Sequence, residues 1–328
     1  MRRLTSTLTS ALAPALAVVL LVPACSPGPA PSQIVPRSAP APQPANASTV
    51  TAAPSSAPGP APSCDATASL RPGPLPPPGQ MPAGSTMERI LQRGRLIAGV
   101  DQNSYLMGFR NSFTGEIEGF DVDVARQIAK AIFGDEKKVQ FKVVTAAERI
   151  PMLQRGDVDV VARTMTITCD RLADVDFSQV YYQAGQRVLV RRNSGITGVE
   201  GLGDKRVCVA SGSTSLGNVV NRARTTVSVP NWTDCLVMLQ QGQADAISTD
   251  DTILAGLAAQ DPYTEVVGAR FTEEPYGVGV PKGREDLVRF VNGVLERMRG
   301  DGTWRGMYQR WLGTLGPAPA PPVARYRD

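Results

Sequence analysis

A strand, helix, strand order occurs twice in series along the chain, and this repetition constrains the fold more than any other feature. In the first series, short apolar runs at residues 96–100, 139–144 and 158–162 have the length and β-branched content of strands. Between the first two, residues 120–133 carry apolar side chains at helical spacing. Alternating strands and helices predict parallel α/β construction.

The pattern restarts after Gly203. The expected elements of this second series are a strand at 206–210, a helix at 214–225, a strand at 227–229, a helix at 234–241 and a strand at 244–248. Two similar α/β units predict two lobes. Lobe 1 is expected to comprise residues 85–184 and 276–316, and lobe 2 residues 185–275.

Two apolar segments without turn signals, residues 180–190 and 271–280, are expected to cross between the lobes. Two extended crossings would form a hinge with the cleft beside it. Helices at 285–298 and 301–311 are expected to pack back on lobe 1, and the Pro-rich tail at 317–328 is expected to be loose.

The N-terminus predicts export and lipidation. Arg2 and Arg3 precede an apolar run at residues 12–22, which ends in Val22-Pro23-Ala24-Cys25. This order predicts a signal peptide at residues 1–24 and a lipid on Cys25. The alternative, a transmembrane anchor, needs about 20 apolar residues, and this run is shorter. We therefore expect a protein held by its lipid on the extracytoplasmic face of the cell membrane, and no later segment is apolar enough to span.

Residues 25–84 follow as a Pro-, Ala-, Ser- and Gly-rich stretch with few charges and almost no large apolar residues. Such a composition predicts an extended tether without a core. The formal net charge is +4, and loss of Arg2 and Arg3 with the signal peptide leaves +2. No basic run with interleaved aromatic residues is present, so nucleic acid is not an expected partner.

Histidine is absent, which excludes Ser-His-Asp and Cys-His nucleophiles and most catalytic zinc sites. With Cys25 reserved for lipid, four cysteines remain in an oxidising compartment: Cys64, Cys169, Cys208 and Cys235. Three pairings are possible. We favour Cys208 with Cys235, because they bracket one strand and helix unit, which leaves Cys64 with Cys169. The alternative is a free, buried Cys169.

Three short stretches together supply what a free amino acid needs from a receptor. They are residues 165–168 with Arg171 behind them, residues 211–215, and residues 249–251. An α-carboxylate is bound by an Arg fork with N–H and hydroxyl donors, and an α-ammonium by a carboxylate with further acceptors. Each stretch alone is more often a solvated surface or a turn, and only their combination favours a binding site.

At Gly119-Phe120-Asp121-Val122-Asp123-Val124, with Ile128, Ala129 and Ile132 in register, the chain resembles the polar amino-acid-binding family of extracytoplasmic solute-binding proteins, family 3. The resemblance runs from about residue 96 to 312 and is strongest to glutamate- and glutamine-binding lipoproteins. It implies a two-lobed α/β fold of the type II periplasmic-binding-protein class, with two hinge crossings and a ligand cleft. It also implies a monomer that needs no metal or cofactor and is not an enzyme.

The resemblance also implies roles in the cleft. Arg171 would clamp the ligand α-carboxylate, with donors from Thr166 and Thr168. The Thr164 carbonyl would face the ammonium. From the other lobe, Ser213 and Thr214 open a helix whose free N–H groups attract the carboxylate. Asp250 would bind the ammonium, and its neighbour Asp251 is expected to be a helix cap, although the register could be off by one.

Further residues concern the ligand side chain. Arg149 matches a position where binders of glutamate and aspartate carry an Arg against the distal carboxylate, and Arg163 adds a second cation. Asp101 matches a position where amide or basic ligands meet an acid, and its pairing with Arg149 or Arg163 would leave a site that tolerates amides. Where relatives sandwich the ligand between rings, this chain has Ala146 and Ser104, with only Tyr105 nearby.

The expected function is therefore reception of a polar amino acid, L-glutamate or L-aspartate first and asparagine or glutamine next. Clamshell closure would deliver the ligand to an ABC permease. One alternative is a sensing lipoprotein that presents its closed form to a membrane receptor. The other is an enzyme on this fold, such as a dehydratase or a cell-wall lyase, which would need a carboxylate over the cleft with no ammonium to bind.

Overall fold

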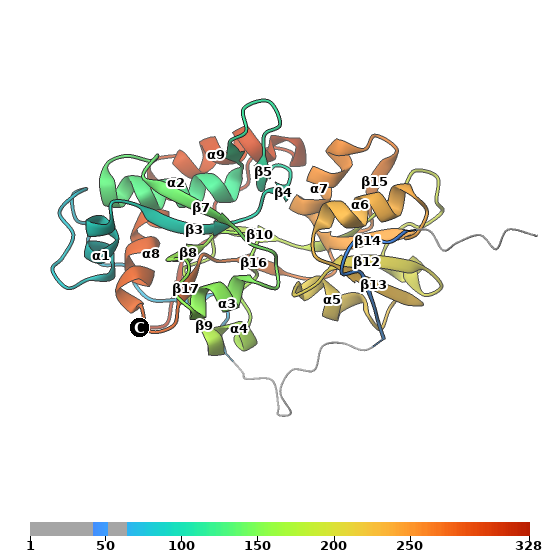
Figure 1. Ribbon diagram of the computed structural model, residues 1–328, viewed down its shortest axis with the longest axis horizontal. Coiled ribbons are helices and arrows are strands. Elements are labelled where there is room, and N and C mark those ends of the chain that lie inside the picture. The colour runs from blue at the N-terminus through green and yellow to red at the C-terminus, as the bar shows by residue number, and fades with distance from the viewer. Residues whose placement is uncertain (1–41, 52–63) are drawn as a thin grey trace, which may run out of the picture. The chain divides into compact units, whose positions relative to one another are not determined.

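The computed structural model describes residues 42–51 and 64–328 of the chain (Figure 1). The predicted signal peptide and Cys25 lie outside these residues. Within the described part of the chain, no helix has both the length and the apolar character needed to cross a membrane.

Lobe 1 is built on a five-stranded sheet in the order β7-β3-β8-β17-β9. Its strands are β3 (Leu96–Val100), β7 (Val139–Val143), β8 (Val160–Val161), β9 (Val175–Phe177) and β17 (Gly279–Pro281). The β3 strand is parallel to β7 and β8, whereas β17 is antiparallel to β8 and β9. A separate three-stranded meander joins β4 (Asn103–Ser104), β5 (Gly108–Arg110) and β6 (Ile117–Glu118).

Six helices belong to this lobe: α1 (Thr86–Arg93), α2 (Phe120–Phe133), α3 (Arg149–Gln154), α4 (Cys169–Asp174), α8 (Glu285–Gly300) and α9 (Thr303–Leu312), followed by the 3₁₀ turn Gly313–Leu315. The apolar stripe of α2 is fully buried, as its helical spacing predicts. The helix ends at Gly134, which adopts φ 74°, a left-handed conformation that glycine tolerates. The two long C-terminal helices pack with α2 in one core.

Lobe 2 is built on a six-stranded sheet in the order β1-β13-β12-β14-β11-β15. Its strands are β1 (Ser48–Val50), β11 (Gln186–Arg191), β12 (Arg206–Ala210), β13 (Thr225–Val229), β14 (Ala246–Asp250) and β15 (Thr264–Val267). Its helices are α5 (Thr214–Val219), α6 (Trp232–Gln240) and α7 (Asp251–Gln260), with a 3₁₀ turn at Val199–Leu202. The predicted helix at 214–225 is thus shorter, since it ends at Val219 and β13 begins at Thr225.

The two predicted crossings meet in an antiparallel ribbon of β10 (Tyr182–Ala184) and β16 (Glu274–Tyr276). Figure 1 shows this ribbon between the two sets of sheets and helices. The apolar cores on either side are separate. Lobe 1 has one core around α2 and α8 and a smaller one around Leu153 and Phe177, and lobe 2 has one around β12 and α6. This arrangement confirms the predicted two-lobed α/β fold with two hinge crossings.

The predicted tether differs from the structure at two places. Residues 48–50 form β1, which pairs antiparallel with the edge strand β13. Val50 packs partly buried against the lobe 2 core. The Pro- and Ala-rich composition hid a three-residue Ser-Thr-Val strand that hydrogen-bonds to an open sheet edge.

Residues 64–84 are also packed. Leu70 and Met81 belong to the lobe 1 core, and β2 (Ala68–Ser69) pairs in parallel with β18 (Arg325–Tyr326). The expectation of a loose tail at 317–328 is wrong at this pair. It failed because a strand of two residues leaves no periodic pattern in the sequence.

Both favoured disulfides are present. Cys208 on β12 is bonded to Cys235 on α6, with their Cα atoms 5.4 Å apart. Cys64 is bonded to Cys169 at the start of α4, with a Cα separation of 5.8 Å. The second bridge joins the N-terminal segment to the helix that carries Arg171.

Candidate functional site

The segment after β8 carries the Thr164–Arg171 motif in an unusual backbone conformation. Thr164 has φ 39°, which is left-handed and unfavourable for a β-branched residue. Its N–H donates to the Asp121 carboxylate at 2.7 Å, and the Tyr181 hydroxyl donates to the other oxygen of that carboxylate, also at 2.7 Å. Burial raises the pKa of Asp121 to about 7, against the opposing effect of these two hydrogen bonds. Asp121, from the family-like motif on α2, therefore holds the motif loop in place.

Arg171 reaches from α4 toward lobe 2. Its guanidinium donates to the Thr166 carbonyl at 2.7 Å and to the Gly212 carbonyl at 3.1 Å. Burial lowers the pKa of Arg171. Thr168, predicted as a ligand donor, is the N-cap of α4, where its hydroxyl accepts the Arg171 N–H at 3.2 Å.

Arg149, the first residue of α3, is a buried cation bound only to carbonyl oxygens. Its guanidinium donates to the carbonyls of Ala146 at 2.8 Å, of Arg163 and Thr164 at 3.2 Å, and of Gly212 at 3.0 Å. Burial, with the neighbouring cations Arg171 and Arg163, lowers its pKa. No carboxylate of the described residues forms an ion pair with it, so an incoming anionic group would be attracted to it.

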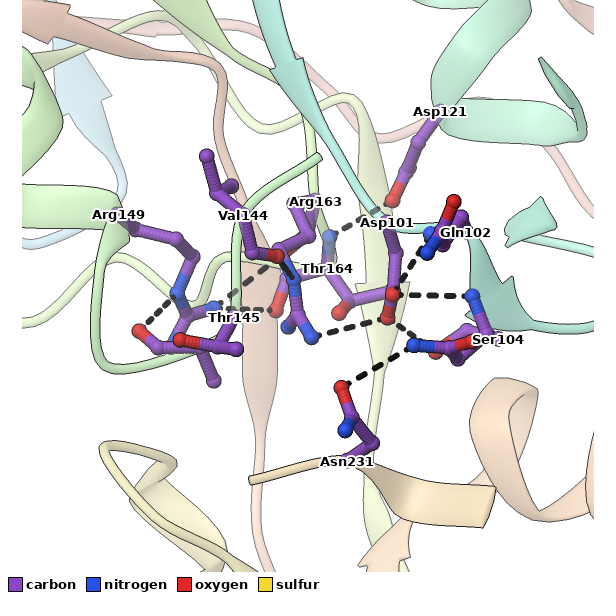
Figure 2. Close-up of polar contacts among 12 residues, drawn as sticks. Asp101, Gln102, Ser104, Asp121, Val144, Thr145, Arg149, Arg163, Thr164 and Asn231 are labelled. Atoms are coloured by element: carbon purple, nitrogen blue, oxygen red, sulfur yellow. Dashed lines mark hydrogen bonds and ion pairs between the residues drawn. The ribbon is translucent and has the colours of Figure 1, made fainter. Parts of the chain in front are cut away.

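Arg163 is buried but already paired. Its guanidinium lies 2.9 Å from the Asp101 carboxylate and donates to the Val144 carbonyl at 2.7 Å. Asp101 also accepts the Ser104 hydroxyl at 2.6 Å (Figure 2). Of the two pairings that the sequence left open for Asp101, the structure thus has the one with Arg163.

The lobe 2 loop approaches lobe 1 through Gly212. This residue has φ +73°, and a Cβ added to it would lie 2.6 Å from the Ala147 Cα of lobe 1. Only glycine allows this approach, which brings the Gly212 carbonyl to Arg149 and Arg171. Ser213 occupies the N-cap position of α5, but its hydroxyl donates backward to the Ala210 carbonyl at 2.6 Å.

Asp250 ends β14 and is buried. One of its carboxylate oxygens accepts the Tyr276 hydroxyl at 2.5 Å, while the other has no hydrogen-bond partner among the described residues. Burial first, and then the nearby Glu274 and Asp251, raise the pKa of Asp250 to about 8. The N-cap position of α7 is Asp250, one residue before the expected Asp251, which is the register shift that the sequence left open. Asp251 is the first residue of α7, where its carboxylate accepts the Thr252 N–H at 2.9 Å and forms an ion pair with Arg270 at 2.5 Å.

Glu274, on the hinge strand β16, was missed by the sequence reasoning. Its buried carboxylate accepts hydroxyls from Thr166 at 2.6 Å, from Thr214 at 2.8 Å and from Thr272 at 2.8 Å, and the Asn218 amide at 3.4 Å. The available signal was a pair of acidic residues, Glu273 and Glu274, in the predicted crossing, since a charge that becomes buried there requires such partners.

These side chains line a narrow cavity between the lobes that they almost fill, with a volume of about 10 Å³. Eight of the predicted residues line it: Arg149, Arg163, Thr164, Thr166, Arg171, Ser213, Thr214 and Asp250. Ser215 and Thr249, from the predicted stretches 211–215 and 249–251, also line it, and Trp232 and Ile253 join them from lobe 2 without having been predicted. Asp101 lies behind Arg163, and Tyr105 is 38% exposed, with its ring against Phe109 outside this cavity.

The cavity is polarised. Guanidinium groups from lobe 1 lie on one side, and the Asp250 carboxylate belongs to lobe 2. Such an arrangement complements a small molecule that carries both a carboxylate and an ammonium. Among residues 42–51 and 64–328, no cluster of three or more acidic or cysteine side chains is placed to hold a metal ion.

Comparison with known proteins agrees with this geometry. Residues 96–314 match the family described as bacterial extracellular solute-binding proteins, family 3. The chain is 44% identical to the ABC transporter glutamine-binding protein GlnH of Bacillus subtilis over 230 residues. The aligned region covers 69% of this chain and 84% of that protein. It is 31% identical to the glutamate-binding protein GluB of Corynebacterium efficiens, over 71% of this chain and 83% of that protein.

A solved structure, an ancestral arginine-binding protein bound to glutamine, superposes with a TM-score of 0.62 at 36% identity. The superposition covers 67% of this chain and 99% of that one.

Proposed function

Because this chain belongs to the bacterial extracellular solute-binding proteins of family 3, we propose that it is a receptor for a free polar amino acid. The observation that carries the proposal is one cavity in which buried Arg149 and half-buried Arg171 donate only to carbonyls, while one oxygen of buried Asp250 has no partner among the described residues. These are the two charged halves that an α-amino acid requires.

In the proposed complex, the Arg171 guanidinium and the N–H groups that open α5 at Ser213 and Thr214 bind the α-carboxylate. Asp250 binds the α-ammonium, with the Thr164 carbonyl as a further acceptor. Closure of the two lobes brings these groups together, and the ligand stabilises the closed form by contacting both.

Arg149 is the proposed partner of the ligand side chain. Because Asp101 forms an ion pair with Arg163, and no carboxylate in the described part of the chain forms one with Arg149, one net cation remains for the distal group. This favours L-glutamate and L-aspartate, with L-glutamine and L-asparagine next because a carbonyl oxygen also accepts from a guanidinium. The name of the Bacillus subtilis relative supports glutamine, and that of the Corynebacterium efficiens relative supports glutamate.

We propose delivery of the ligand to an ABC permease, supported by the family and by the transporter named for the Bacillus subtilis relative. A lipid on Cys25 would keep the receptor beside that permease. Co-purification from membranes tests this partner, and recovery of a single-chain membrane receptor instead would indicate the signalling alternative.

The decisive experiment is calorimetric titration of the chain from residue 26 onward with the common L-amino acids one at a time. Tighter binding of glutamate or aspartate supports the Arg149 assignment, and tighter binding of glutamine or asparagine means that the Asp101–Arg163 pair governs the pocket. Absence of binding to every amino acid would contradict the receptor proposal, and turnover of a bound ligand would indicate the enzyme alternative. The matched variant Arg171→Ala is expected to bind at least about tenfold more weakly.

A further inference from the structure

Glu274 occupies a position where it contacts both lobes at once. Thr166, one of its partners, belongs to lobe 1, whereas Thr214 opens α5 of lobe 2. Both hydroxyls donate to the same carboxylate oxygen, and both threonines line the cavity. Glu274 itself lies on the hinge strand outside the lining, so it acts on the cavity through these two side chains.

A hydroxyl has one proton and two lone pairs. A carboxylate offers only acceptors, so each threonine that contacts Glu274 must give it that single proton. The hydroxyl oxygens of Thr166 and Thr214 then present only lone pairs to the cavity. In this state they cannot donate to a ligand carboxylate, but they can accept from a ligand N–H group.

We propose that Glu274 is a positioning residue that takes the hydroxyl protons of Thr166 and Thr214 and thereby turns both hydroxyls into acceptors for the amino group of the ligand. This inference rests on the proposed function, and it changes the role expected for Thr166 from carboxylate donor to ammonium acceptor. The recognised group is a protonated amine that one charged carboxylate, Asp250, and two neutral oxygens share.

The other oxygen of Glu274 strengthens the assignment. It accepts the Thr272 hydroxyl and the Asn218 amide, so four donors surround one carboxylate. Asn218 also donates to the Gln186 side chain at 2.8 Å, which limits its freedom to turn away. A glutamine at position 274 has one oxygen and one NH₂ group, and it could not accept from all four donors.

The experiment compares Glu274→Gln and Glu274→Met with the matched control Glu273→Gln, which makes the same chemical change at the neighbouring exposed residue. L-glutamate and L-glutamine are the probes, titrated by calorimetry, and circular dichroism melting checks the fold. We expect Glu274→Met to lose about tenfold or more in affinity. Glu274→Gln should lose less, because its amide oxygen can still accept from Thr166 and Thr214, and Glu273→Gln should stay within about twofold.

Whether ligand affinity falls or rises in Glu274→Met distinguishes hydroxyls that accept from the ligand amino group from hydroxyls that donate to the ligand carboxylate. If the two hydroxyls instead donated to the ligand carboxylate, Glu274 would compete with the ligand for their protons. Removing the Glu274 carboxylate would then tighten binding. Tighter or unchanged binding by a folded Glu274→Met variant would therefore overturn the inference.

A double-mutant cycle with Thr166→Val separates positioning from a general loss of structure. If Glu274 acts through the Thr166 hydroxyl, the loss caused by Thr166→Val shrinks once Glu274 is replaced by Met. Additive losses would overturn the inference. Should Glu274→Met not fold, the same cycle is run with Glu274→Gln, and Thr214→Val provides an independent arm in which weaker binding is expected and unchanged binding contradicts the proposal.

The outcomes for the inference and for the proposed function differ. A wild-type chain that binds no amino acid contradicts the receptor function itself. A wild-type chain that binds, with Glu274→Met equal to it, contradicts only the role of Glu274.

Discussion

At the scale of a single residue, the burial of Asp250 disfavours the ionised carboxyl that ligand binding requires. Its buried carboxyl has a pKa raised to about 8, so ionisation at neutral pH is costly in the free protein. The same ionised carboxyl is the proposed partner of the ligand ammonium. The residue therefore favours binding at the expense of stability, a trade-off that is common at functional sites.

The first prediction concerns the stability of the Asp250→Asn variant. Because the folded pKa lies above the unfolded value of 3.8, the stabilising effect of the protonated carboxyl is complete below pH 4 and declines as the pH rises toward 8. Asparagine cannot ionise, so the variant should melt several degrees higher than the wild type at pH 7. Each kcal/mol gained in the free energy of unfolding raises the melting temperature by about 2–4 °C. Differential scanning calorimetry without ligand measures this.

The pH dependence provides the control for that prediction. At pH 4 the wild type and Asp250→Asn should melt within about a degree of each other, because both are then uncharged at this position. A variant that melts lower than the wild type at pH 7 would contradict the burial argument.

A second prediction is proton release on binding. Below about pH 8 the free Asp250 holds a proton, and a bound ammonium would expel it. The charged and titratable groups facing it are Glu274, Asp251, Tyr276 and Arg149. Affinity for L-glutamine should rise by up to about tenfold per pH unit from pH 6 and level off near pH 8.

Calorimetry at pH 7 in two buffers of different ionisation enthalpy measures the number of protons released. Close to one proton per ligand is expected. Affinity that does not vary with pH, without proton release, would show that Asp250 is already ionised in the free protein.

At the level of elements, the loop before α5 depends on Gly212. The φ of +73° and the contact with Ala147 both exclude a larger residue when the lobes are closed. Gly212→Ala should therefore lower ligand affinity by about fivefold or more, because closure is strained by at least about 1 kcal/mol.

The matched control is Gly217→Ala in α5, where an added Cβ meets no atom within 4 Å. That substitution should leave affinity within about twofold and stabilise the helix slightly. Equal losses in both variants would place the effect in α5 itself and not in the approach of the lobes.

The elements themselves were largely predictable from the sequence, because their apolar periodicity is strong. The buried stripe of α2 and the strands β3 and β12 lie where the pattern places them. The hinge crossings were predictable from extended apolar runs without turn residues. Both disulfides followed from the even number of cysteines and the spacing of Cys208 and Cys235.

The sequence predicted which residues belong to the candidate site better than it predicted which of them contact one another. Arg149 and Arg163 were both foreseen, but only tertiary structure decides which of them Asp101 neutralises. Thr168 illustrates a further limit, because the sequence reasoning gave it a ligand role without showing that its hydroxyl also caps α4. Glu274 escaped notice because four donors from three separate segments define its role.

For the whole molecule, the Cys64–Cys169 bridge joins the N-terminal segment to lobe 1, and β2 of that segment pairs with the C-terminal strand β18. We predict that the double variant Cys64→Ser, Cys169→Ser exchanges the amide protons of β2 and β18 faster than the wild type. The chain-entropy estimate for a loop of this length is about 4–5 kcal/mol. Hydrogen exchange read by mass spectrometry measures the local effect.

The strands β12 and β14 of lobe 2 serve as the internal reference in that measurement, since neither contacts the bridge. Their exchange should be unchanged. Unchanged exchange at β18 would mean that the core packing of Leu70 and Met81, and not the disulfide, holds the two chain ends on lobe 1.

The pairing of β1 with lobe 2 also has a mechanical meaning. A pull applied from the N-terminal side of the chain reaches β1 before it reaches Cys64. Three residue pairs hold β1 against β13, whereas Cys64 is held covalently. The force would separate β1 from β13 first. After that, the force would act on lobe 1 through Cys64 and no longer on lobe 2. We therefore expect β1 to detach at low force, while both lobes stay folded.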